Sequence, residues 1–145
     1  MAYQAKAEML IHSTAESAFT AFVEPDLLVK FWLASSSAPL APGARARWDF
    51  LVPGASETVA VTVFDPPWHL AFDWSAAINV DIRFASRDGD AVVVTIVASG
   101  FQSADVAIGA TEGFSIVLCD LKTLLESGKS AHLVRDKASL IASAG

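Results

Sequence analysis

Few side chains in this sequence have both the type and the spacing that metal or phosphate chemistry requires. Histidine occurs three times and cysteine once, at Cys119. No two of these residues have the close spacing found in zinc sites, so we predict that the chain binds no metal. No Gly-rich turn joins a strand to a helix that carries a Lys and a Ser or Thr. We therefore expect neither nucleotide binding nor a cofactor.

Acid–base catalysis needs an ionisable group within hydrogen-bond reach of the substrate. The two candidates that we single out are His12, at the end of the first predicted strand, and Asp105, before the long C-terminal helix. The competing interpretation of His12 is a turn residue with ordinary hydrogen bonds. His69 and His132 are expected at the surface, and Cys119 is expected to be an inert thiol. Further candidates at the rims are Ser99, Glu112 and Asp120.

The elements that would position these groups begin with a strand. From Tyr3 to His12 apolar and polar residues alternate, which is typical of a half-buried strand. Ser13 and Glu16 have the spacing of a capping box, which predicts that Ser13 caps a helix. Pro25 should end this helix and begin a second short one, because a proline lacks the N–H that a first helical position does not use.

The middle of the chain predicts a meander of antiparallel strands. Residues 31–43 lose all periodicity and contain two prolines, which indicates a loop. Five runs with strand character follow, separated by turns short enough for hairpins. Together with the first strand they predict a curved antiparallel sheet of about six strands. The five runs are Ala44–Val52, Glu57–Asp65, Trp68–Ser75, Ile78–Ser86 and Ala91–Ser99.

A long amphipathic helix is predicted near the C-terminus. We expect it to start between Val106 and Phe114 and to end at Gly128, which suits a left-handed cap. Ile116 and Cys119 lie on its predicted outer side, which indicates a partner surface such as that of a homodimer. One or two further turns are expected after this helix, around Leu133, Leu140 and Ile141.

One face of the predicted sheet carries no ionisable side chain, whereas the other carries charges that we expect to be solvated. In the second run of the meander, Val59, Val61 and Val63 are expected on the apolar face. The long helix must cover this face, which predicts an α+β fold. A dry cavity and a solid core of interlocking rings are both compatible with the sequence. The residues that would bind a ligand in such a cavity are Trp32, Trp48, Phe50, Val61, Phe72, Trp74, Val80, Ile82, Phe84, Phe114 and Leu118.

Composition limits the class of protein. We treat the 145 residues as a single domain, residues 1–145. Charged residues make up 18%, below the average of about 25%, and a chain this apolar is expected to fold. The net charge of −6 and the absence of Lys/Arg runs argue against nucleic acid. The uncharged stretches are too short to span a bilayer. The single cysteine and the charged N-terminal residues Lys6 and Glu8 predict a cytoplasmic protein.

The order of elements and several motifs resemble the START-like (SRPBCC) superfamily with its helix-grip fold. More narrowly, they resemble the branch named after the activator of the heat-shock-90 chaperone ATPase. Gly113-Phe114 is similar to the Gly-Trp start of that family's long helix, with Phe114 in place of Trp. The other matching motifs are Ser13 to Phe19, Phe31-Trp32, Pro42-Gly43, Arg47-Trp48-Asp49-Phe50, Asp65-Pro66-Pro67, Leu70-Ala71-Phe72-Asp73-Trp74 and Ser99-Gly100-Phe101.

This resemblance implies a ligand chamber between the sheet and the long helix, with its mouth near the early loop. The superfamily includes lipid carriers, hormone receptors and polyketide cyclases, so it leaves several functions open. The uncharged inner face favours binding of a small hydrophobic or aromatic molecule over catalysis. A cyclase or dehydratase that uses the same cavity is the first alternative. A protein that regulates a chaperone ATPase, as the branch name implies, is the second.

Overall fold

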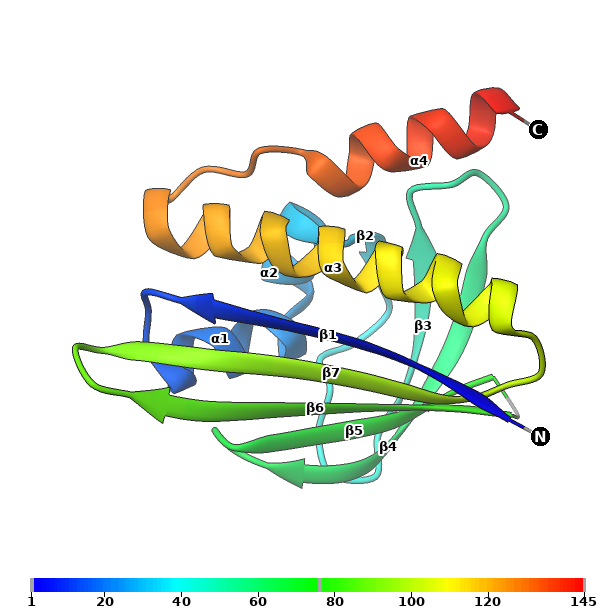
Figure 1. The fold of residues 1–145 in the computed structure, drawn as a ribbon. Coiled ribbons are helices and arrows are strands. Elements are labelled where there is room, and N and C mark those ends of the chain that lie inside the picture. The colour runs from blue at the N-terminus through cyan, green and yellow to red at the C-terminus, as the bar shows by residue number, and fades with distance from the viewer. Residues whose placement is uncertain (1, 76, 145) are drawn as a thin grey trace.

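Figure 1 shows the computed structural model, which describes residues 2–75 and 77–144. In this part of the chain seven strands form one antiparallel sheet in the order β1-β7-β6-β5-β4-β3-β2. The strands are β1 (Tyr3–Ile11), β2 (Leu33–Ser36), β3 (Arg45–Phe50), β4 (Ser56–Asp65), β5 (His69–Trp74), β6 (Ile78–Arg87) and β7 (Ala91–Phe101). The helices are α1 (Ala15–Val23), α2 (Pro25–Phe31), α3 (Ala104–Ser127) and α4 (Leu133–Ala144).

The sheet curves beneath α3, and this arrangement confirms the predicted α+β helix-grip fold (Figure 1). The two short helices follow β1 as predicted, and they lead into a further strand, β2. The apolar face of the sheet and the helices enclose a core in which the largest side chains are fully buried. These include Trp48, Phe22, Phe31, Phe72, Ile82, Ile96 and Leu118.

The seventh strand, β2, lies where the sequence predicted only a loop. Leu33 is fully buried, and β2 forms an antiparallel backbone pairing with β3. One side-chain hydrogen bond supplements this pairing. Ser35 Oγ donates to Asp49 Oδ2 over 2.8 Å. This hydrogen bond, with a smaller contribution from the Arg47 guanidinium, holds the pKa of Asp49 below its ordinary value. Ser35 thus bonds to a residue 14 positions away in the sequence. The apolar–polar periodicity of residues 33–36 does not reveal such a contact, so β2 was not predicted.

The helix boundaries differ from prediction at three places. Thr14, not Ser13, caps α1, since its Oγ1 accepts the Ser17 N–H over 3.1 Å. The long helix begins earlier than expected, at Ala104, because the Ser103 side chain caps it. Its predicted end is confirmed, because Gly128 is a left-handed cap with φ of 80°. Beyond it, α4 has 12 residues, more than the one or two turns expected.

A register shift in β4 changes which of its residues face the core. The shift lies between Val61 and Val63. Val63 pairs with Ala71, whose neighbours in β5 point into the core, so the prediction that Val63 faces inward is wrong. Phe64 takes that place and packs edge-on against Phe19, with ring centroids 5.4 Å apart. Bulges of this kind interrupt strict alternation and turn one side chain to the other face.

A second shift, at the end of β7, directs Phe101 to the inner face. In the pairing of β1 with β7, Ser99 and Phe101 lie opposite consecutive residues of β1, so Gly100 is extra. Gly100 has φ of 107°, a conformation that side chains disfavour, and an added Cβ would collide with the carbonyl oxygen of Ala77. Glycine is therefore required at this bulge.

We predict that Gly100→Ala lowers the free energy of unfolding by about 1–3 kcal/mol more than Gly89→Ala, because the backbone of Ala77 must move. Gly89 also has a positive φ, 78°, but open space around it, so it is the matched control. Urea denaturation of both variants measures the difference. Equal destabilisation by the two substitutions would contradict the close approach of Gly100 to Ala77.

Candidate functional site

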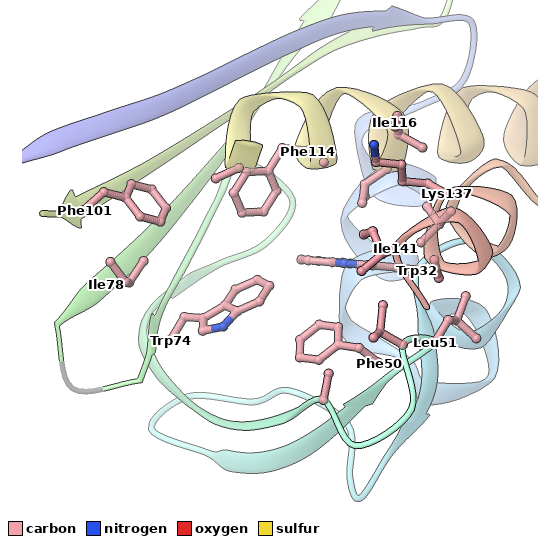
Figure 2. A pocket seen from close by; sticks show the side chains of 17 residues that line it. Trp32, Phe50, Leu51, Trp74, Ile78, Phe101, Phe114, Ile116, Lys137 and Ile141 are labelled. Atoms are coloured by element: carbon pink, nitrogen blue, oxygen red, sulfur yellow. The ribbon is translucent and has the colours of Figure 1, made fainter. Parts of the chain in front are cut away.

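A cavity of about 380 Å³ lies between one end of the sheet and the helices α3 and α4 (Figure 2). Aromatic and aliphatic side chains form almost its entire wall. The sheet and its connections contribute Trp32, Phe50, Leu51, Val52, Ala55, Trp74, Ile78 and Phe101. The helices contribute Ala110, Gly113, Phe114, Ile116, Val117, Val134, Lys137, Ala138 and Ile141.

Four aromatic rings form the continuous part of this wall. Trp74 stacks on Phe50 with ring centroids 5.1 Å apart and an interplanar angle of 12°. Trp74 also meets Phe114 edge-on at 5.9 Å. Trp32 contacts Trp74 at 5.8 Å and Phe114 at 6.2 Å. Rings in these offset and T-shaped arrangements fix one another and leave their remaining faces toward the cavity (Figure 2).

The end of β3 also contributes to the cavity in a way that alternation did not predict. The predicted strand extended to Val52, whereas β3 ends at Phe50. The chain then turns, and the Phe50 N–H donates to the carbonyl oxygen of Ala55 over 2.9 Å. This tight turn brings Leu51 and Val52 to the edge of the cavity.

Helix α4 covers one side of the cavity that the sheet and α3 leave open, and the cavity remains partly open to solvent. Val134, Lys137, Ala138 and Ile141 line the cavity at helical spacing. The same i, i+3, i+4, i+7 spacing is present in the sequence and would have identified this face. Only one or two helical turns were predicted after α3, so these four residues were not among the predicted ligand-binding residues.

Asp120 attaches the beginning of α4 to α3. Asp120 is the only charged residue that is buried in the described part of the chain, with 1% of its surface exposed. One carboxylate oxygen accepts the Val134 N–H over 3.2 Å, and the other accepts the Ser130 hydroxyl over 3.3 Å. The carboxylate thus satisfies a backbone donor in the first turn of α4, as an N-cap side chain would.

Four of the eleven predicted ligand-binding residues line the cavity: Trp32, Phe50, Trp74 and Phe114. The rest are buried in the core and do not line the cavity. Trp48 and Phe72 pack directly behind the cavity wall, whereas rings of α1 fill the space next to Phe84. Phe22, for example, packs against Phe84 with centroids 5.9 Å apart. The interior is therefore solid on one side and hollow on the other. The residues in the solid part are Trp48, Val61, Phe72, Val80, Ile82, Phe84 and Leu118.

The candidates for acid–base chemistry do not lie on the cavity. Asp105 is exposed in the first turn of α3. His12 is exposed, and its backbone N–H donates to Glu126 Oε2 over 2.7 Å. That bond, together with Lys122, lowers the pKa of Glu126 and ties the end of β1 to α3. His12 thus holds the turn after β1 through its backbone.

The remaining polar candidates are also placed away from the cavity. His69 Nε2 lies 2.7 Å from Asp81 Oδ2, in a part-buried pair between neighbouring strands. Cys119 is a free, half-buried thiol on α3.

Ile116, which was expected on an outer partner surface, instead lines the cavity beneath α4. Over residues 2–75 and 77–144 no cluster of three or more His, Cys, Asp or Glu has the arrangement of a metal site.

Lys137 is the ionisable residue of the cavity wall. Its ammonium group forms an ion pair with Glu112 on α3, and Figure 2 shows its nitrogen turned toward that helix. The sheet residues on the cavity are apolar, as the sequence predicted. The site can therefore desolvate an apolar molecule, and among the lining residues only Lys137 could bind an ionic group.

The curved sheet around a long helix, with a hollow between them, defines a domain of the START-like class. The sequence matches the family described as Activator of Hsp90 ATPase homolog 1-like protein over residues 12–126. The chain therefore belongs to this family. Helix α4 lies beyond the matched residues. A comparison with curated proteins finds no match.

Solved structures agree with this assignment of the fold. Protein SSP2350 from Staphylococcus saprophyticus is 25% identical, with a TM-score of 0.79 over 88% of this chain and 95% of its own. Aha1 from Colwellia psychrerythraea, solved as a dimer, is 18% identical, with a TM-score of 0.80 over 88% of this chain and 99% of its own. DynU16, a putative protein in the dynemicin biosynthetic locus, is 20% identical, with a TM-score of 0.79 over 88% of this chain and 48% of its own.

Among the described helices, none has the length and apolar character needed to cross a membrane.

We predict that Asp120→Ala lowers the free energy of unfolding by about 1–3 kcal/mol, because the part-buried N–H of Val134 and the Ser130 hydroxyl lose their acceptor. Amide hydrogen exchange at Val134 should become faster. Asp136→Ala, on the exposed side of the same helix turn, is the control and should cost less than about 1 kcal/mol. If Asp120→Ala leaves exchange at Val134 unchanged, Asp120 does not hold α4.

Proposed function

We propose that this protein binds a small hydrophobic molecule, with an aromatic ring system preferred, in the cavity beneath α4. The observation that supports this most strongly is the wall itself: of its lining residues only Lys137 is ionisable. Transfer of an apolar molecule from water to such a wall is favourable in proportion to the area buried. Polar molecules would lose their hydration without forming enough hydrogen bonds with the wall to replace it.

The size of the cavity supports a ligand of one or a few rings. A volume of about 380 Å³ falls within the range of roughly 300–1,000 Å³ typical of small-molecule sites. It is more than twice the roughly 150 Å³ cavity that holds benzene in an engineered protein. Trp32, Trp74 and Phe114 line the cavity with their aromatic rings. The ring surfaces that face the cavity suit the offset and edge-on contacts that aromatic ligands form.

The alternatives have less support from the described residues. A cyclase or dehydratase needs few acid–base groups, but the two candidates, His12 and Asp105, lie away from the cavity, and Lys137 is the ionisable residue on its wall. Regulation of a chaperone ATPase rests on the family name alone. A homodimer of this chain is likewise a proposal, suggested by the Aha1 relative that was solved as a dimer.

We predict that Gly113→Phe weakens binding of a neutral aromatic probe, N-phenyl-1-naphthylamine, by about tenfold or more, a loss of ~1.4 kcal/mol. Gly113 lines the cavity in the middle of α3, and a Cβ added there meets no other atom within 4 Å. A phenyl group at this position would occupy the space of the ligand. Probe fluorescence, titrated with protein, measures the affinity.

Gly109→Phe is the matched control. Gly109 lies one turn earlier in the same helix, also has open space around its Cβ position, and is exposed away from the cavity. Its substitution should leave probe affinity unchanged within about twofold. Equal loss in both variants, or no binding by the unmodified protein, would contradict a ligand site in this cavity.

A further inference from the structure

The cavity wall has one polar feature, and it lies where α3 and α4 meet. Lys137, on α4, is the ionisable residue among those that line the cavity. A lysine on an apolar wall normally extends its ammonium group into water while its methylene groups stay on the apolar surface. Here the ammonium group turns toward α3 and pairs with Glu112 (Figure 2). The ammonium group therefore lies at the edge of the cavity, beside a largely exposed carboxylate.

The two members of this pair differ in exposure. The Glu112 side chain is 58% exposed, whereas the Lys137 side chain is 35% exposed. Glu112 does not line the cavity and has water on most of its surface, so it can turn outward at small cost. Exposed ion pairs of this kind are weak, because solvent screens the attraction and ordering both side chains costs entropy. Lys137 can thus exchange Glu112 for another anion.

We infer that the ligand carries one negatively charged group, such as a carboxylate, and that Lys137 binds this group at the α4 side of the cavity. This inference rests on the proposed function and adds the ligand class to it. An anion bound in the cavity would replace Glu112 as the partner of the Lys137 ammonium group, and a charge-assisted hydrogen bond at this partly buried position is stronger than in water. The rest of the ligand would contact the aromatic wall formed by Trp32, Trp74 and Phe114.

The overall charge of the protein does not explain such a preference. The net charge is −6, which repels anions at long range. A preference for an anionic ligand must therefore come from the local contact with Lys137. A cationic ligand would gain from the aromatic rings, but it would lie beside the Lys137 ammonium group without a carboxylate on the cavity wall to balance it.

Three probes of the same shape test the inference: 2-naphthoate, neutral 2-naphthamide, and cationic 2-naphthylmethylammonium. Quenching of the tryptophan fluorescence, to which Trp32 and Trp74 on the cavity wall contribute, measures the dissociation constant of each probe. We expect 2-naphthoate to bind about tenfold more tightly than 2-naphthamide, the effect of one charge-assisted hydrogen bond at a partly solvated site. The cationic probe should bind most weakly.

Two variants assign this preference to Lys137. Lys137→Gln should weaken 2-naphthoate by about tenfold and leave 2-naphthamide within about twofold. Glu112→Gln, which frees Lys137 from its partner, should strengthen 2-naphthoate by up to about fivefold. Lys129→Gln is the control, because it changes the net charge equally at an exposed position that does not line the cavity. Thermal melts confirm that all variants are folded.

The outcomes separate this inference from the proposed function. If all three probes bind equally, or if Lys137→Gln weakens them equally, the cavity binds apolar molecules but the anionic ligand class is wrong. If Lys129→Gln has the same effect as Lys137→Gln, the preference reflects net charge and the assignment to Lys137 is wrong. If no probe binds, the proposed function fails, and the inference fails with it.

Discussion

The apolar inner face of the sheet is wider than one helix can cover, and the rest of the structure depends on this mismatch. Helix α3 crosses the sheet beside β1 and β7 (Figure 1). The aromatic residues of α1 and α2 fill a second region, where Phe22 contacts both Phe31 and Phe84. The remaining region of the inner face, next to Phe50 and Trp74, is covered by α4. Because α4 has few buried side chains, Ala138 among them, this region stays partly empty.

The hollow keeps its shape because its boundaries are fixed by specific contacts. The rings of Trp32, Trp74 and Phe114 brace one another. The bulge at Gly100 turns Phe101 inward. Two polar contacts connect α4 to α3: the buried Asp120 carboxylate near its beginning, and the pair between Lys137 and Glu112 farther along. These polar contacts hold α4 in place, while the cavity wall is apolar except at Lys137.

Most of the fold could be predicted from the sequence, because half-buried strands and amphipathic helices have local periodicities. Some exceptions are local, such as the caps Thr14 and Ser103, but others depend on contacts between distant residues. β2 pairs with the backbone of β3, and its Ser35 hydroxyl bonds to Asp49 of that strand. Bulges move Val63 off the inner face and bring Phe101 onto it. The start of α4 is held by Asp120, 14 residues from Val134. Which inner-face residues line a hollow depends on how rings such as Phe22 pack, and no sequence pattern encodes that.

The central claim is that an apolar ligand lies between the aromatic wall and α4. The most direct test is to measure nuclear Overhauser effects between bound N-phenyl-1-naphthylamine and the methyl groups of the labelled protein. The account predicts strong effects to Ile78, Val117 and Ile141, which line the cavity, and none to Val92, which is fully buried elsewhere in the core. Effects confined to exposed methyl groups such as those of Ile108 would contradict it.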